Sequence, residues 1–228
     1  EGFQPQSNTV TLMPNTGSLK AGAAFRPLTS DLKELGTKAE LLNGRMQVSA
    51  AVYEINQRNI LINANLPAFP DSLTTRGGER SRGIELDVAG YLLPHWQVNA
   101  SYSYIDAVIT EEKDPALVGA RKQNTPYNSA QVWTRYNFLP RSPLKGVGIG
   151  LGLQHYGDRI PWFTRDFKVP AYTVLDLALY YHPGKGQMQL ALNLNNALDQ
   201  RYWIGAQNYL RLFPGAPRNA MLTATYKF

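Results

Sequence analysis

The last eight residues, from Met221 to Phe228, alternate between apolar and polar side chains and end on an aromatic residue. Leu222, Ala224, Tyr226 and Phe228 share one face of an extended chain. A period of two residues predicts a β-strand with one apolar side and one polar side. The same alternation recurs along most of the chain, so the sequence predicts an all-β, antiparallel fold.

About nine segments show this period, and each is close to the roughly 9–11 residues that a tilted strand needs to cross a bilayer. They are residues 32–41, 45–56, 81–92, 96–106, 128–138, 146–156, 172–182, 187–195 and 218–228.

The connections between these segments alternate in length. Short turns are expected at residues 42–44, 93–95, 139–145 and 183–186, and long loops at 57–80, 107–127, 157–171 and 196–217. Short turns on one rim and long loops on the other are typical of a transmembrane β-barrel of the outer membrane. The sequence therefore predicts short periplasmic turns and long extracellular loops.

Composition excludes several other classes of protein. No run of about 18 apolar residues is present, which argues against membrane-spanning helices. The absence of cysteine excludes disulfides and thiolate metal sites. A net charge of +6 favours an anionic partner. Because the Lys and Arg residues are scattered and form no nucleic-acid motif, we expect lipopolysaccharide or an anionic ligand rather than nucleic acid.

Alternation alone does not decide which face points inward, since a soluble β-sandwich buries its apolar face. The polar face here is rich in amides and small residues, as expected for a watery interior. The apolar face has aromatic residues toward its ends, as expected for an interfacial girdle. These residues are Trp96, Tyr104, Phe138, Tyr181, Tyr226 and Phe228. Both features favour a membrane barrel whose apolar face meets lipid.

Nine strands cannot close an antiparallel barrel, because the first and the last would run in the same direction. The first 30 residues contain Pro5, Pro14 and Pro27 and have the composition of a loop. We therefore expect further barrel strands before Glu1, rather than a tenth strand hidden in residues 1–30.

Four segments, in this order, resemble the C-terminal barrel of TonB-dependent outer-membrane receptors, specifically the siderophore-receptor branch. They are the hairpin at residues 34–45, Arg80-Ser-Arg-Gly-Ile-Glu-Leu-Asp87, Asn195-Asn-Ala-Leu-Asp-Gln-Arg-Tyr202 and Gly215-Ala-Pro-Arg218. The hairpin departs from the family pattern, with Lys33 where a tyrosine is usual. The resemblance extends over roughly residues 28–228.

The resemblance implies a receptor for ferric siderophores in the outer membrane of a Gram-negative cell, surrounded by lipid and lipopolysaccharide. It implies that residues 1–228 are the C-terminal part of the barrel. The plug domain, the earlier strands and the N-terminal region that contacts the TonB complex would lie outside the chain. No cofactor is expected, since the ferric siderophore is the transported ligand. Receptors of this kind for cobalamin, haem or a carbohydrate are the alternative.

Ligand contacts are expected from loop aromatics and arginines, because flat, anionic iron chelates favour stacking and cation–π contacts. The candidates are Tyr127, Trp162, Phe163, Arg165, Tyr202, Trp203, Tyr209 and Arg211.

A self-contained outer-membrane barrel enzyme is a further alternative. The three histidines are isolated in the sequence, and only His155, with Asp158 and Asp166 nearby, could begin a catalytic site. No metal site and no catalytic residue is therefore predicted.

Overall fold

The computed structural model describes residues 2–5, 26–63, 73–112, 114–162, 167–183, 187–208 and 210–228. Within these ranges it contains twelve strands and a 3-10 helix, η2 (Pro115–Leu117). The strands are β1 (Gly2–Gln4), β2 (Leu28–Leu41), β3 (Met46–Asn63), β4 (Leu73–Leu93), β5 (Trp96–Glu111), β6 (Asn128–Asn137), β7 (Val147–Tyr156), β8 (Tyr172–Tyr181), β9 (Met188–Asn195), β10 (Trp203–Asn208), β11 (Arg211–Pro214) and β12 (Asn219–Tyr226).

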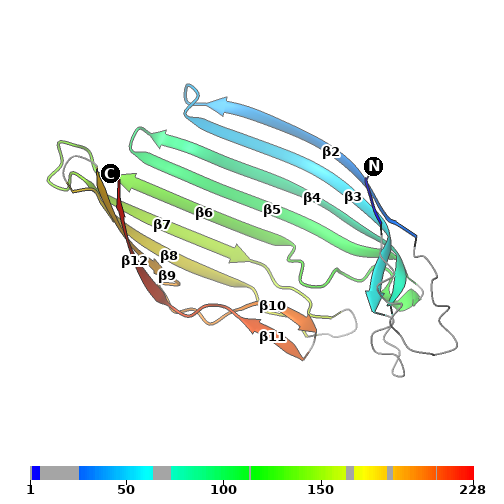
Figure 1. Cartoon of the computed structure of the whole chain (residues 1–228). Helices are drawn as coiled ribbons and strands as arrows, with labels where there is room; N and C mark the ends of the chain where they lie inside the picture. Colours follow the sequence, from blue (N-terminus) through cyan, green and yellow to red (C-terminus); the bar gives the residue numbers. More distant parts are fainter. Residues whose placement is uncertain are drawn as a thin grey trace. The chain divides into compact units, whose positions relative to one another are not determined.

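Ten of these strands form one sheet in the order β1-β2-β3-β4-β5-β6-β7-β8-β9-β12, in which the pairs with a resolved register are antiparallel. Strands β10 and β11 form a separate two-stranded hairpin. Figure 1 shows this order in strands β6 to β9 and β12, which lie side by side. Among the described residues β1 and β12 are the two edges of the sheet.

The nine predicted strands are confirmed as β2 to β9 and β12, and most boundaries agree within a few residues. The predicted loop at 57–80 is wrong in part, because β3 continues to Asn63 and β4 begins at Leu73. Strand β5 likewise continues to Glu111, into the predicted loop at 107–127. These extensions lack the apolar alternation that identifies a half-buried strand, so cross-strand pairing, rather than the local pattern, makes them extended.

Three further strands lie in regions that the sequence analysis assigned to loops. The expectation that residues 1–30 hide no tenth strand is wrong, because β1, although it has only three residues, pairs with β2 through Gly2 and Ser30. The hairpin β10–β11 occupies part of the predicted loop at 196–217. Its register shifts twice, between Trp203 and Gly205 and between Ala206 and Asn208, and such irregularity conceals a period of two.

The chain divides into two compact units. The first consists of residues 1–34, 53–82 and 106–122. Its described part has a small core of Ala107 and Ile109, which are fully buried. The buried Glu79 carboxylate forms an ion pair with Lys122 at 2.8 Å, and the Arg82 guanidinium forms one with the Asp106 carboxylate at 2.9 Å. Ion pairs therefore connect β4 both to β5 and to the segment that follows β5.

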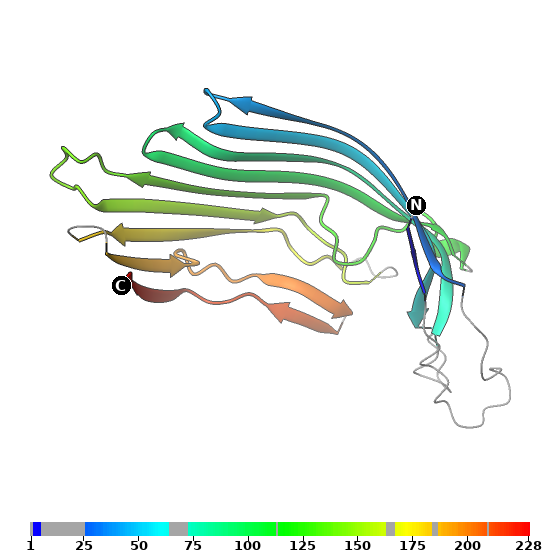
Figure 2. The same ribbon diagram turned by 45° about the horizontal axis from the view of Figure 1, so that its top comes forward.

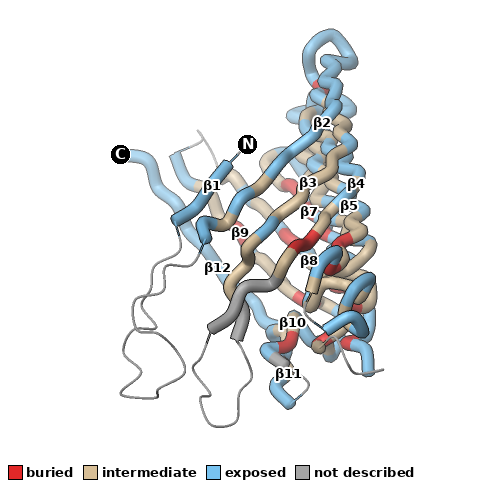
Figure 3. Tube along the Cα trace, turned by 90° about the vertical axis from the view of Figure 1, so that its right-hand side faces the viewer, coloured by how far each residue is buried: buried red, intermediate tan, exposed pale blue. Residues whose placement is uncertain are grey.

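The second unit consists of residues 35–52, 83–105 and 123–228. Within it, cross-strand register places apolar residues of six strands in one row, Trp96–Tyr136–Ile149–Leu179–Leu192–Leu222. All the aliphatic members of this row are exposed, Leu192 by 44% and Leu222 by 71%. The apolar face is thus continuous across strands and uncovered, which is not the interior of a compact soluble core. Figure 3 shows β12 exposed along its length.

The short-turn end of this apolar face contains part of the predicted aromatic girdle, whereas Tyr104 lies at the opposite end of the β5–β6 pairing, across from Asn128. Trp96 lies opposite Tyr136, and Tyr136 contacts Phe138 edge-on with ring centroids 5.4 Å apart. At the C-terminus, Tyr226 and Phe228 make a similar contact at 5.1 Å. Amphipathic aromatics at one level of neighbouring strands are the expected arrangement for a membrane interface.

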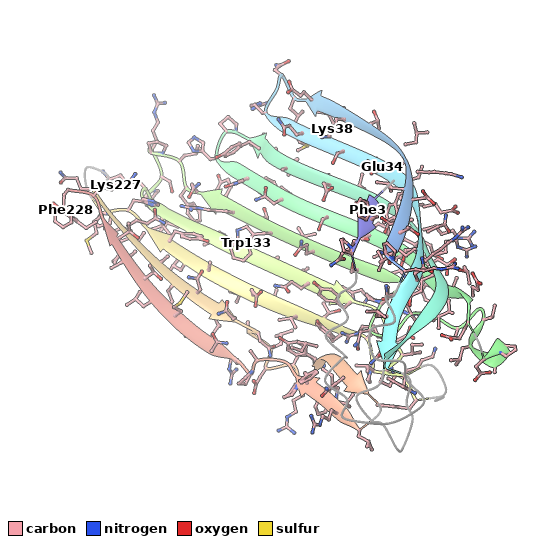
Figure 4. All side chains as sticks on the ribbon, turned by 45° about the vertical axis from the view of Figure 1, so that its right-hand side comes forward. Phe3, Glu34, Lys38, Trp133, Lys227 and Phe228 are labelled. Carbon is pink, nitrogen blue, oxygen red and sulfur yellow. The ribbon has the colours of Figure 1, made fainter. Side chains whose placement is uncertain are left out.

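On the opposite, polar face of the sheet, glycines make room for a large side chain. Gly150 and Gly152 of β7 leave space in which the Trp133 side chain of β6 lies, and a Cβ atom at either glycine would fall within 3.0 Å of the indole. Figure 4 labels Trp133 on this part of the sheet. Nearby, the Arg135 guanidinium lies 3.8 Å from the centroid of the Tyr180 ring. The glycines of β7 therefore serve close packing on the polar face, while alternate residues keep the apolar face.

No helix among the described residues is long and apolar enough to cross a membrane.

The orientation of the two faces is testable in β9. Replacing Leu192 with Arg places a charge in the apolar row and should reduce the free energy of barrel assembly by about 2–4 kcal/mol. The matched variant Asn193→Arg, on the polar face beside it, should be tolerated far better. Denaturant titration of the protein in lipid vesicles measures both, and equal tolerance would contradict the assigned orientation.

Candidate functional site

The long connections of the second unit meet beyond one end of its strands, opposite the short turns. In Figures 1 and 2 the β10–β11 hairpin lies at this end, away from the C-terminus. The described segments that contribute are residues 123–127, 157–162, 167–171, 196–208 and 210–218. Because each segment leaves a paired strand, its position is fixed at both ends by the sheet.

Three tyrosines form an aromatic cluster at the base of these connections. Tyr156 and Tyr172 are cross-strand partners at the ends of β7 and β8, with ring centroids 5.3 Å apart. Tyr202 stacks on Tyr172 at 4.5 Å. The guanidinium of Arg159 lies 5.3 Å from the Tyr172 ring, a distance compatible with a cation–π interaction. The cluster connects the start of the hairpin to the end of the sheet.

The first strand of the hairpin is held by side chains from two other connections. The guanidinium of Arg159, only 3% exposed, donates to the carbonyls of Ile204 at 2.5 Å and Trp203 at 2.7 Å. The Asn124 side chain donates to the Ala206 carbonyl and accepts from the Ala206 N–H at 2.8 Å. These contacts satisfy backbone groups of β10 that the main sheet does not pair.

Asn196 organises the turn that follows β9. It is 2% exposed, and its side-chain amide donates to the carbonyls of Gln200 and Ala216 while its oxygen accepts from the Gln200 N–H. Its own N–H donates to Asp176 at 2.8 Å. Asn196 adopts a positive φ of 49°, which asparagine tolerates better than most residues. The resemblance motif at 195–202 is therefore a structural turn.

The motif at residues 195–202 contacts the last of the four motifs, Gly215-Ala-Pro-Arg218. The Tyr202 ring covers Gly215 so closely that an added Cβ would fall within 2.5 Å of ring atoms. The Asp199 carboxylate accepts a hydrogen bond from the Arg218 N–H at 3.0 Å. The two motifs, which precede and follow the β10–β11 hairpin in the chain, are thus in direct contact.

The described candidates for ligand contact lie in different surroundings. Tyr127 stacks on Tyr104 of β5, with ring centroids 6.1 Å apart, whereas Tyr202 belongs to the tyrosine cluster. Trp203 is 40% exposed on β10, and Arg211 is exposed on β11, where it donates to Gln207 at 3.2 Å. Trp162 is half-buried in the connection after β7. Phe163, Arg165 and Tyr209 lie outside the described residues.

Sequence analysis missed the residues that build this region. Nothing in the local sequence distinguishes Arg159 or Asn124 from other polar loop residues, because their partners lie 44 or 45 and 82 positions away. Tyr172 was counted only as the start of a strand. The positive φ of Asn124 distinguishes it from other loop residues, but a backbone angle can be read only from coordinates.

The enzyme alternative gains no support from His155. Its Nδ1 lies 2.9 Å from the Thr173 hydroxyl, on the face of β7 that also contains Leu151 and Leu153. Asp158 pairs with Lys168 at 3.3 Å, and Asp166 lies outside the described residues. The described part of the chain has no group of three His, Asp or Glu side chains placed to hold a metal ion.

The structural role of Asn196 is testable. Asn196→Gly keeps the positive φ but removes three buried side-chain hydrogen bonds, so the free energy of unfolding should fall by about 2–3 kcal/mol. Asn43→Gly is the matched control, since Asn43 has a φ of 59° and lies exposed in the short turn before β3. Thermal unfolding of the protein measures both, and equal melting temperatures would refute the role.

Comparison with known proteins supports the assignment suggested by the motifs. Residues 1–197 match the family model described as TonB dependent receptor-like, beta-barrel. The metal-pseudopaline receptor CntO of Pseudomonas aeruginosa is 32% identical over 94% of this chain. The ferrichrome outer membrane transporter/phage receptor of Escherichia coli K12 is 31% identical over 100% of it. The chain spans only 30% and 29% of these two proteins.

Solved structures show the same fold. The ferric-catecholate import receptor Fiu of Escherichia coli K12, in its closed form, superposes with a TM-score of 0.77 at 26% identity. The match covers 99% of this chain and 32% of that receptor. Together with the antiparallel sheet and its exposed apolar face, these matches show that the chain belongs to the TonB-dependent receptor β-barrel family.

Proposed function

We propose that this chain forms C-terminal strands and loops of an outer-membrane receptor that imports a chelated metal ion, with a ferric siderophore as the ligand. The observation on which this depends is the shared chemistry of its relatives. The two proteins above are named for metal-pseudopaline and ferrichrome, and a third, from Salmonella typhimurium, is the ferrioxamine B receptor, 28% identical over 97% of this chain.

An outer-membrane location is supported by the exposed apolar rows of the second unit. Large aliphatic side chains such as Ile149, Leu179 and Leu192 are between 44% and 48% exposed. A continuous surface of this kind is stabilised by hydrocarbon and is unfavourable in water. Lipid is therefore the proposed partner of the apolar face, and the net charge of +6 supports anionic lipopolysaccharide as a further partner.

The proposed ligand contacts remain the loop aromatics and arginines. Among the described candidates, Trp203 and Arg211 lie on the β10–β11 hairpin with exposed side chains. An indole face and a guanidinium suit a flat or anionic chelate, because stacking and ion pairing bind it without removing the metal. We propose coupling to the TonB complex on family grounds, through a part of the receptor outside this chain.

A second ligand class has one specific observation in its favour. CntO is named for a metal chelate without iron in its name, so chelates of metals other than iron belong in the same assay. Cobalamin, haem and carbohydrates are the remaining alternatives from the sequence.

Deleting the receptor gene should abolish growth of iron-starved cells on one ferric chelate and leave growth on the others unchanged. Ferrichrome, ferrioxamine B and metal-loaded pseudopaline form the first panel, with cobalamin, haem and oligosaccharides as the second. Unchanged growth on every metal chelate, with loss of uptake of a member of the second panel, would overturn the proposal.

Trp203→Ala should weaken chelate binding by about 1–3 kcal/mol, because it removes an exposed aromatic face at the loop end. Trp96→Ala is the matched control, since Trp96 is 39% exposed but lies at the short-turn end. Intrinsic fluorescence quenching by the ferric chelate measures both affinities. An equal loss in the two variants would exclude a direct role for Trp203.

A further inference from the structure

We propose that Gln123, Asn124 and Arg159 form a clamp that keeps the β10–β11 hairpin ordered before ligand arrives, so that its side chains meet the chelate in place. We call these three residues the β10 clamp. The ligand part of this inference rests on the proposed function. The ordering part concerns the free receptor and stands independently of it.

The hairpin needs such support because it is small. Its strands have six and four residues, they form a sheet of their own, and their register shifts twice. An isolated two-stranded hairpin is marginally stable in water. Its order must therefore come from contacts outside its own two strands.

Asn124 provides the first contact by imitating a neighbouring strand. Its side-chain amide presents one donor and one acceptor to the backbone of Ala206, which is 3% exposed. Gln123 adds a donor to the Gln207 carbonyl at 2.9 Å. Asn124 reaches this position with a φ of 58°, and its own N–H donates to Ile160 at 3.0 Å. One residue thus joins β10 to two connections.

Arg159 provides the second contact, next to Ile160 in the chain. Its planar guanidinium donates to two successive carbonyls, those of Trp203 and Ile204, and also lies 5.3 Å from the centroid of the Tyr172 ring. Side chains of residues 123, 124 and 159 consequently bond backbone groups of four β10 residues, Trp203, Ile204, Ala206 and Gln207. Ala206, within this stretch, is buried.

Ordering the hairpin in advance has a consequence for binding. A loop that is disordered in the free protein loses conformational entropy when it binds, and this cost reduces affinity. Trp203 and Arg211 are on the clamped hairpin, so releasing the clamp should raise the dissociation rate even though neither side chain is altered. The clamp residues are positioning residues, since they act through the backbone of β10.

The experiment uses the complete receptor with a single spin label at Leu210→Cys, a site that is 76% exposed at the hairpin turn. This chain has no cysteine of its own, which leaves the label position unambiguous within it. Asn124→Gly removes the side chain but keeps the positive φ, and Gln123→Ala is a milder second variant. Asn43→Gly is the matched control, with a φ of 59° in a short turn.

In the ligand-free receptor, Asn124→Gly should increase label mobility, whereas Asn43→Gly should leave it unchanged. With ferrichrome or ferrioxamine B as probe, the dissociation rate should rise roughly tenfold, as expected for one to two net hydrogen bonds. Unchanged label mobility in Asn124→Gly and Gln123→Ala would overturn the clamp. Increased mobility with an unchanged dissociation rate would overturn its role in binding.

These outcomes separate the clamp from the proposed function. A wild-type receptor that binds neither chelate would count against the proposed ligand class, while the mobility measurements would still decide whether the clamp exists. Assembly of each variant is checked by heat-modifiable electrophoretic mobility. If Asn124→Gly fails to assemble, Gln123→Ala provides the test.

Discussion

Pairing of backbone hydrogen-bonding groups between antiparallel neighbours is the constraint on which this structure depends. A strand whose alternate side chains are apolar can expose that face only where hydrocarbon or another protein covers it, and it must pair its N–H and C=O groups laterally. The row from Trp96 to Leu222 shows both conditions across six strands of the second unit. That pairing fixes the ends of the connecting segments that the structure describes in the second unit.

Where the ladder ends, side chains take over the task of satisfying the backbone. Asn196 pairs four groups around its turn, and Asn124 presents an amide to Ala206 as a neighbouring strand would. Arg159 does the same for two carbonyls of β10. Amide and guanidinium groups suit this role because they can offer several hydrogen bonds in fixed geometry. The loop end is therefore built by polar residues that need not touch ligand.

This arrangement gives the family motifs a structural explanation. Tyr202 ends one motif and covers Gly215, which begins the next, while Asp199 bonds the backbone of Arg218. The residues of these two family motifs therefore have a structural role. They hold the chain in place where it returns from the β10–β11 hairpin to its last strand, β12. Trp203, by contrast, is 40% exposed, and we propose that positions of this kind, rather than the motif residues, contact the ligand.

The sequence by itself determined the strands, their sidedness and the exposed apolar face, because a period of two residues is a local property of each segment. It also located the motifs that identify the family. Only the tertiary structure decided the outer extensions of β3 to β5, the β10–β11 hairpin and the roles of Asn124, Arg159 and Tyr172. Those features depend on partners up to 82 residues away, and no local pattern encodes such pairings.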